Sequence, residues 1–238
     1  KGDDRLVFIL NKLLFEQVPV LFDDLADELY VSRSTLSHDF KKIRVMLSEY
    51  NLSIESRANK GVYVSGEERD KRRFIINYFL ENQFFKAIHF YVKFNFFDQN
   101  VPLEEFARIV LDECQEANLK LSDFVLQNLV VHIALSMIRL KSGFEIKNID
   151  CQMTDDAIER KVAQRILSKV SQVTNQEFPV QEIDYITLHL LAKSQQCQKN
   201  QKNTSEEVLK KSLFKTFQDL GLDDIYNFSS DFQLIEGL

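Results

Sequence analysis

The chain has 238 residues, of which 45% are hydrophobic and 28% are charged, and its formal net charge is −6. This length and composition are typical of a soluble globular protein with two compact units and a partial third. They predict no membrane insertion, because no uncharged apolar run reaches transmembrane length and the start lacks the pattern of a signal peptide.

The N-terminal segment predicts three helices. Leucine and isoleucine recur at helical spacing over Arg5–Phe15, which indicates a first helix. Asp23 and Asp24 open a second helix, because carboxylates stabilise the exposed N–H groups at a helix start. Ser32 is a favourable N-cap for a third helix that runs to about Tyr50.

The third helix is predicted to turn one face to the core and the other to solvent. Leu36, Phe40, Ile43 and Leu47 recur at intervals of four, three and four, which places them on the core face. Hydroxyl and basic side chains lie outward, where they suit contacts to phosphates and to base edges in a major groove. These candidate DNA-binding residues are Ser32, Arg33, Ser34, Thr35, Ser37, His38, Lys41 and Lys42.

A short hairpin is predicted after the third helix. Its strand candidates, residues 52–57 and 62–65, are joined by a turn that ends at Gly61. Arg57 and Lys60 lie at its tip, so the hairpin is a candidate DNA-binding wing. Residues 30–73 hold ten Lys or Arg and six Asp or Glu, which indicates a locally basic surface on an acidic chain.

The sequence Leu25-Ala26-Asp27-Glu28-Leu29-Tyr30-Val31-Ser32-Arg33-Ser34-Thr35-Leu36 resembles the helix-turn-helix of bacterial transcription factors. We therefore expect residues 1–68 to form a winged helix-turn-helix domain that binds a double-stranded DNA operator. The alternative is a three-helix unit that serves packing alone.

The next segment predicts helices that lead into a second domain. Residues 69–89 are predicted to form a connecting helix, with charged residues first and apolar ones after them. The phenylalanine-rich residues 84–97 are predicted to be helical core or interface. Pro102 begins a further helix that ends near Asn118.

Three more helices complete a predicted all-α bundle, so the fold class is mainly α. The first covers residues 122–141 and is closed by Gly143, because a helix commonly ends at a glycine in the left-handed conformation. Thr154-Asp155-Asp156 is predicted to cap the second, which runs to about Val173. Pro179 begins the third.

Two of these apolar helices each carry a polar stripe with one histidine. Residues three or four apart lie on one helical face, and a histidine there can accept a phosphoryl group. Arg139 is a candidate to pair with the charge that phosphorylation would add. The alternative is that both rings are hydrogen-bonded core histidines. The stripes consist of Asn128, His132, Ser136 and Arg139, and of Glu182, Tyr185, His189 and Lys193.

Two motifs resemble the PTS regulation domain of regulators that are controlled by the bacterial sugar phosphotransferase system. They are Leu129-Val130-Val131-His132-Ile133, followed by Arg139 and Gly143, and Glu182-Ile183-Asp184-Tyr185-Ile186-Thr187-Leu188-His189-Leu190. The resemblance covers residues 90–199. It implies that His132 and His189 are phosphorylation sites, served by the phosphocarrier protein HPr or by a sugar-specific permease component.

A weak repeat extends this resemblance towards the C-terminus. Ser122-Asp123-Phe124-Val125-Leu126 recurs as Ser230-Asp231-Phe232-Gln233-Leu234, and each copy follows an amphipathic helix. We therefore expect residues 204–238 to be the truncated start of a second regulation domain. Since the chain also begins with Lys1, it is predicted to be a piece of a longer protein.

Together these patterns predict a transcriptional regulator, similar to the mannitol-operon activators, that controls a sugar-uptake operon as a cytoplasmic homodimer. An RNA-binding antiterminator with the same regulatory module and a virulence-type regulator of similar architecture are the alternatives. No enzyme activity, cofactor or metal is expected, because two histidines without clustered carboxylates make neither a metal site nor a catalytic triad. The cysteines fit no metal spacing or disulfide framework, which favours a reducing cytoplasm: Cys114, Cys151 and Cys197.

Overall fold

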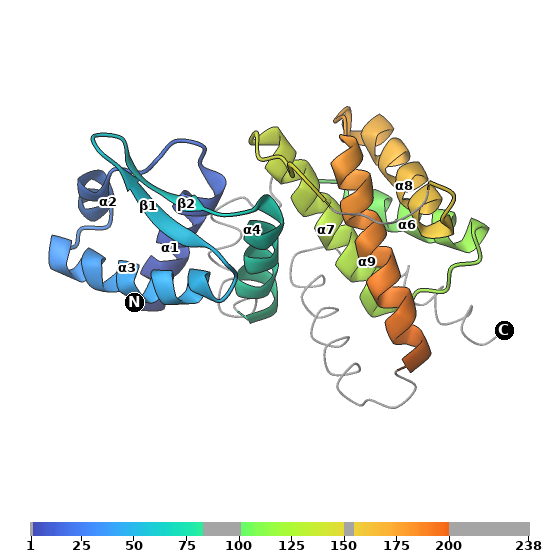
Figure 1. Cartoon of the computed structure of the whole chain (residues 1–238), viewed down its shortest axis with the longest axis horizontal. Helices are drawn as coiled ribbons and strands as arrows, with labels where there is room; N and C mark the ends of the chain where they lie inside the picture. The colour runs from blue at the N-terminus through green and yellow to red at the C-terminus, as the bar shows by residue number, and fades with distance from the viewer. Residues whose placement is uncertain (1, 83–100, 150–154, 200–238) are drawn as a thin grey trace. The chain divides into compact units, whose positions relative to one another are not determined.

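The computed structural model describes residues 2–82, 101–149 and 155–199, and these are mainly helical, as predicted (Figure 1). The chain divides into an N-terminal unit, residues 1–98 with 138–147, and a second unit, residues 99–137 with 148–238. The predictions made for residues 84–97 and for residues 204–238 lie outside the described residues.

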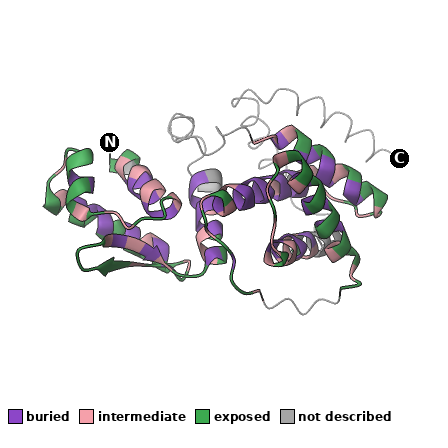
Figure 2. Cartoon of the chain, turned by 90° about the horizontal axis from the view of Figure 1, so that it is seen from above, coloured by how far each residue is buried: buried purple, intermediate pink, exposed green. Residues whose placement is uncertain are grey.

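The N-terminal unit begins with three helices, as the apolar spacing predicts. Leu25 of the second helix and Leu36 and Ile43 of the third are fully buried. Figure 2 shows buried positions in purple on the inner faces of the helices and exposed ones in green on their outer faces. The helices are α1 (Gly2–Phe15), α2 (Phe22–Glu28) and α3 (Arg33–Ser48).

The turn between α2 and α3 is held by backbone hydrogen bonds. Tyr30 adopts a left-handed conformation with φ of 52°. Its N–H donates to the carbonyl of Asp27 at 3.1 Å, and the N–H of Val31 donates to that of Ala26 at 3.0 Å. These bonds satisfy the last carbonyls of α2 and reverse the chain, so α3 can start at once.

The predicted hairpin is present. Strands β1 (Ser53–Arg57) and β2 (Gly61–Ser65) are antiparallel, with Arg57 opposite Gly61. Val20, in the α1–α2 connection, forms an isolated bridge with Val62 that the sequence did not indicate. Gly61 has φ of 104°, and a Cβ there would lie 2.5 Å from the carbonyl oxygen of Val20. The absence of a side chain at Gly61 therefore lets the hairpin lie against this connection.

A helical segment follows the hairpin and changes its winding partway. It starts as helix α4 (Glu68–Ile75) and continues as a π-helix, η1 (Ile76–Asn82). Phe74 stacks on Tyr78 with ring centroids 5.4 Å apart, and Tyr50 packs edge-on against Phe74 at 5.2 Å. These rings join the segment to the end of α3.

The second unit contains four helices among its described residues. Their inner faces are apolar, and Phe106, Ile133, Ile166 and Ile186 are fully buried. The helix α7 carries residues of both units, since residues up to Met137 belong to the second unit and Ile138–Lys147 to the N-terminal one. The helices are α6 (Leu103–Glu116), α7 (Asp123–Lys141), α8 (Ile158–Thr174) and α9 (Val180–Lys199).

Ion pairs tie neighbouring helices of the second unit together. Glu113 of α6 is 1% exposed and accepts from Nε of Arg165 at 2.7 Å and from Lys169, both on α8. Arg160 of α8 pairs with Asp184 of α9, with Nη2 and Oδ1 3.1 Å apart. Burial raises the pKa of Glu113, but Lys169 and Arg165 outweigh that effect and the pKa is lowered.

One predicted helix start is wrong and one predicted helix end is confirmed. The N-cap of α8 is Ala157, without a side-chain cap, so Asp155 and Asp156 do not cap this helix, and Thr154 lies outside the described residues. The carboxylates of Asp155 and Asp156 instead pair with Arg160 and Lys161, at 3.1 Å and 3.6 Å. Gly143 does close α7 in a left-handed conformation, with φ of 79°.

Candidate functional site

The start of α3 gathers hydroxyl groups at a helix N-terminus. The Ser32 side chain accepts a hydrogen bond from the N–H of Thr35 at 3.2 Å, which confirms it as the N-cap. Its Oγ also lies 3.0 Å from Oγ of Ser34 and 2.9 Å from Oγ1 of Thr35. Because the N–H groups and the dipole of a helix start attract anions, this end of α3 suits a phosphate.

The outward face of α3 is accessible, as its predicted role requires. Thr35 is half-buried and the other predicted residues of this helix face are exposed. Arg33 pairs with Asp23 at 2.7 Å, but the two side chains are 72% and 64% exposed. A pair so open to water is weak, so Arg33 can exchange Asp23 for a phosphate. The exposed residues are Ser32, Arg33, Ser34, Ser37, His38, Lys41 and Lys42.

The tip of the hairpin offers two more cations. Arg57 and Lys60 are both exposed. The guanidinium of Arg57 lies over the ring of Tyr63, 4.9 Å from its centroid, and the hydroxyl of Tyr63 donates to Glu55 at 2.7 Å. The ring of Tyr63 thus orients the guanidinium of Arg57 through a cation–π contact.

An ion pair orients α3 within the N-terminal unit. Asp39 is 2% exposed and receives two hydrogen bonds from Arg5 of α1, at 2.9 Å and 3.2 Å. The acidic residue sits on the inner side of α3, whereas the lysines of the same helix are exposed. The sequence analysis did not predict this ion pair. The one available signal was the position of Asp39 directly before the core residue Phe40.

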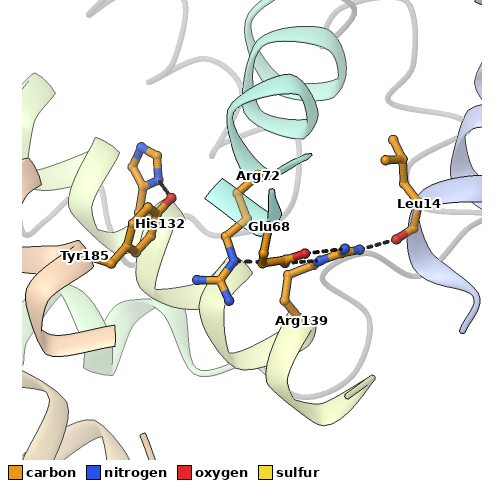
Figure 3. A network of polar contacts seen from close by, with 6 residues as sticks. All are labelled: Leu14, Glu68, Arg72, His132, Arg139 and Tyr185. Atoms are coloured by element: carbon orange, nitrogen blue, oxygen red, sulfur yellow. Dashed lines mark hydrogen bonds and ion pairs between the residues drawn. The ribbon is translucent and has the colours of Figure 1, made fainter. Parts of the chain in front are cut away.

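The second unit brings the two predicted histidines into one site. His132 comes from α7 and His189 from α9, and their ring centroids are 3.9 Å apart. The hydroxyl of Tyr185, one turn before His189, lies 2.9 Å from Nδ1 of His132 (Figure 3). His132 is 7% exposed, Tyr185 is 4% exposed, and His189 is half-buried. His132 thus meets two residues of α9 that lie at least 53 positions later in the chain.

Hydrogen bonds fix the protonation of one ring. Nδ1 of His189 lies 2.8 Å from the backbone carbonyl oxygen of Tyr185. A carbonyl only accepts hydrogen bonds, so Nδ1 of His189 carries a proton. Tyr185 therefore engages Nδ1 of His132 through its hydroxyl and Nδ1 of His189 through its carbonyl oxygen, although the sequence marked it only as a member of the stripe.

The other stripe residues lie in different surroundings. Ser136 and Glu182 are fully buried, and Asn128 is half-buried. The side chain of Lys193 lies outside the described part of the structure. Polar members of both stripes thus lie partly or fully inside the protein.

Arg139 belongs to a buried network in the N-terminal unit (Figure 3). Its Nε and Nη2 donate to the two carboxylate oxygens of Glu68 at 2.7 Å and 3.0 Å, and Nη1 donates to the carbonyl of Leu14. Arg72 donates to the same carboxylate at 3.1 Å. The centroid of the Phe144 ring lies 3.8 Å from the Arg139 guanidinium carbon.

This network matches the charge of Arg139 with that of Glu68. Arg139 and Arg72 are 0% exposed and Glu68 is 8% exposed. Burial raises the pKa of Glu68, but the hydrogen bonds and charges of Arg139 and Arg72 outweigh it, so the pKa is lowered. A contact between Arg139 and a phosphoryl group would therefore have to replace the bidentate pair with Glu68.

The described residues contain no group of three or more His, Cys, Asp or Glu side chains that could hold a metal ion. Within the same residues, no helix has the length and apolar character needed to cross a membrane.

Comparison with protein families gives a match for each unit. Residues 3–79 match the Mga helix-turn-helix domain, and residues 107–193 match the PRD domain. The first match contains α2, α3 and the hairpin, and the second contains His132, Tyr185 and His189.

Two curated proteins of Bacillus subtilis (strain 168) are similar to the chain. The probable licABCH operon regulator is 27% identical over 195 residues, which cover 79% of this chain and 30% of that protein. The transcriptional regulator ManR is 25% identical over 242 residues, which cover 99% of this chain and 36% of that protein. The chain thus spans about a third of the length of these relatives.

Proposed function

Because the chain carries a Mga helix-turn-helix domain followed by a PRD domain, we propose that it is the DNA-binding and sensing part of a transcriptional regulator, an activator of a sugar-uptake operon. Phosphorylation of His132 and His189 controls it, with HPr or a sugar-specific phosphotransferase component as donor. The observation that carries this proposal is the contact between the two rings, 3.9 Å apart inside the PRD domain.

The surroundings of the histidines support control by phosphorylation. A phosphoryl group adds about two negative charges. In a site where His132 and Tyr185 are almost fully buried, such a charge costs far more than at the surface unless the packing changes. The modification therefore alters how α7 and α9 pack, and this is the physical basis of the switch.

The N-terminal unit supports duplex DNA as the ligand rather than RNA. The start of α3 presents hydroxyls and basic groups on a helix that can enter a major groove, and the hairpin adds Arg57 and Lys60 beside it. The protein acts in the cytoplasm as a homodimer, because two such units match the two half-sites of an operator. It does not insert into a membrane and has no enzymatic activity.

Phosphotransfer from HPr tests the regulatory half of the proposal. The chain is incubated with enzyme I, HPr and phosphoenolpyruvate, and the phosphorylated residues are located by mass spectrometry. We expect label on His132 or His189 and none after both are replaced by Ala. His38→Ala is the matched control, because His38 is exposed on α3 in the other unit. Undiminished label in the double variant would refute the site assignment.

Salt dependence of DNA binding tests the other half. Replacing Lys41, Lys42 or Lys60 with Ala removes one exposed cation. If each contacts a phosphate, each substitution lowers the slope of log affinity against log salt by about one and weakens binding evenly across sequences. Preference for a hairpin RNA over duplex DNA, with the slope unchanged, would support an antiterminator instead.

A further inference from the structure

Tyr185 touches both histidines of the PRD site by different groups. Its hydroxyl lies 2.9 Å from Nδ1 of His132, and its carbonyl oxygen lies 2.8 Å from Nδ1 of His189. Its ring is 5.8 Å from the ring of His132 and 4.5 Å from that of His189, between centroids. In both histidines the nitrogen that Tyr185 engages is therefore Nδ1.

We propose that Tyr185 is a positioning residue that directs phosphoryl transfer to Nε2 of both histidines. Its side chain orients His132 and its backbone carbonyl orients His189. This inference rests on the proposed function, in which the two histidines accept phosphoryl groups.

For His189 the hydrogen bond to the Tyr185 carbonyl is enough to select Nε2 as the attacking nitrogen. The carbonyl of Tyr185 can only accept, so the proton of the neutral imidazole lies on Nδ1. The lone pair that attacks phosphorus then lies on Nε2. A phosphoryl group at Nδ1 would need both the loss of this proton and the loss of the bond to the helix backbone.

For His132 the burial of the two side chains and the short distance between them also favour Nε2 as the attacking nitrogen. Phosphorus at Nδ1 would have to enter the 2.9 Å gap between Nδ1 and the Tyr185 hydroxyl. Both side chains are at least nine-tenths buried, so separating them disturbs packed residues on α7 and α9. Attack through Nε2 keeps the bond, with Nδ1–H donating to the phenol oxygen.

The transfer balances with a phosphohistidine protein as donor. The lone pair on Nε2 forms the new N–P bond while the N–P bond of the donor breaks. The donor imidazole keeps the electron pair of that bond and leaves as a neutral ring that holds its own proton. The Nδ1 proton of the acceptor stays on Nδ1, hydrogen-bonded to Tyr185, and delocalises the positive charge that develops on the phosphorylated ring.

Tyr185→Phe separates the two contacts, because it removes the hydroxyl and retains the carbonyl. We expect the rate of labelling of His132 to fall by about tenfold, the factor that loss of one buried hydrogen bond represents. Part of the product at His132 should move to Nδ1, while the rate and product at His189 stay unchanged. Tyr50→Phe is the matched control, since it removes a hydroxyl that Asn77 contacts at 2.8 Å in the N-terminal unit.

Two measurements decide the matter. Site-resolved mass spectrometry gives the rate at each histidine, and ³¹P–¹⁵N couplings of the phosphorylated protein identify the phosphorylated nitrogen. ¹⁵N shifts of the unphosphorylated imidazoles report the tautomers, and Tyr185→Phe should change those of His132 alone. This second readout does not move if Tyr185 serves only to fill space.

The outcomes separate the inference from the function on which it rests. Label at Nδ1 in the unaltered protein, or an unchanged rate and tautomer of His132 in Tyr185→Phe, would overturn the role of Tyr185 and leave the phosphorylation sites intact. No label on either histidine with a competent donor would overturn the proposed function itself, and the inference with it.

Discussion

Replacing Glu68 with Gln should be among the most damaging single substitutions in the N-terminal unit. The change keeps the size of the side chain and removes its charge. Glu68 is the shared partner of Arg139 and Arg72, whose side chains are 0% exposed. The guanidinium of Arg139 would then stay in the interior without the carboxylate that accepts two of its hydrogen bonds, which is the costly way to break a buried ion pair.

The size of the effect follows from this burial. Removing one partner of a buried pair costs about 3–5 kcal/mol, and Gln retains one acceptor oxygen, so we expect about 3 kcal/mol. That corresponds to a fall in the folding equilibrium of roughly a hundredfold or more and to a midpoint of thermal unfolding at least about 10 °C lower. Urea unfolding by circular dichroism measures the loss, and hydrogen exchange of peptides from α1, α3 and α4 locates it.

Glu104→Gln is the matched control. Glu104 and Arg108 form the same Glu–Arg pair at i and i+4 as Glu68 and Arg72, but their side chains are 36% and 64% exposed. The control should lose no more than about 0.5 kcal/mol. A loss in Glu68→Gln as small as that of the control would refute the reasoning that burial makes this network costly to break.

The pH dependence of the same variant has a definite sign. The pKa of Glu68 is lowered below 4.5 in the folded chain, so the unfolded chain binds its proton first as the pH falls. The stability that Glu68 contributes is therefore complete above pH 4.5 and is lost as the pH falls through the folded-state pKa. The difference between the parent and Glu68→Gln should shrink in that acid range and stay constant above it.

Three further outcomes are expected. Glu113→Gln should cost about 1.5–3 kcal/mol in urea unfolding, between the two variants above, because its cationic partners are half-exposed, and the loss should shrink below pH 4.5 since its pKa is also lowered. Gly61→Ala should cost about 1–3 kcal/mol through its clash and positive φ, whereas Gly2→Ala, with nothing within 4 Å, should be near neutral; equal midpoints would contradict this. In a time course of phosphotransfer, label should reach the half-buried His189 before His132, which is 7% exposed, and the reverse order would count against access as the limiting step.

Local signals sufficed for much of the N-terminal unit. The spacing of Leu36, Phe40, Ile43 and Leu47 fixed the inner face of α3, and Ser32 caps it as the residue types predict. The bridge from Val20 to Val62 could not be predicted, because it joins residues 42 positions apart without a pattern of its own. The predicted cap of α8 is wrong for a related reason. Carboxylates near a helix start can also pair with cations of the first turn, as Asp155 does with Arg160 and Asp156 with Lys161.

For the histidine site, helical spacing predicted the correct face of each helix and could not predict which faces meet. The register of α7 against α9 decides that His132 and His189 lie together and that Tyr185 lies between them. A tyrosine in an apolar helix is ambiguous in the sequence, because its ring suits a core and its hydroxyl needs a partner. Only the packed pair of helices reveals that the partner is Nδ1 of His132.

Arg139 shows why a continuous stripe need not serve a single site. It follows His132 by two turns on one face of α7, which made it a candidate to bind the phosphoryl group. A guanidinium in an apolar interior requires a carboxylate, however, and the carboxylate that Arg139 contacts, Glu68, lies 71 residues earlier in the chain. The stripe therefore divides at Met137, with His132 in the second unit and Arg139 in the N-terminal one.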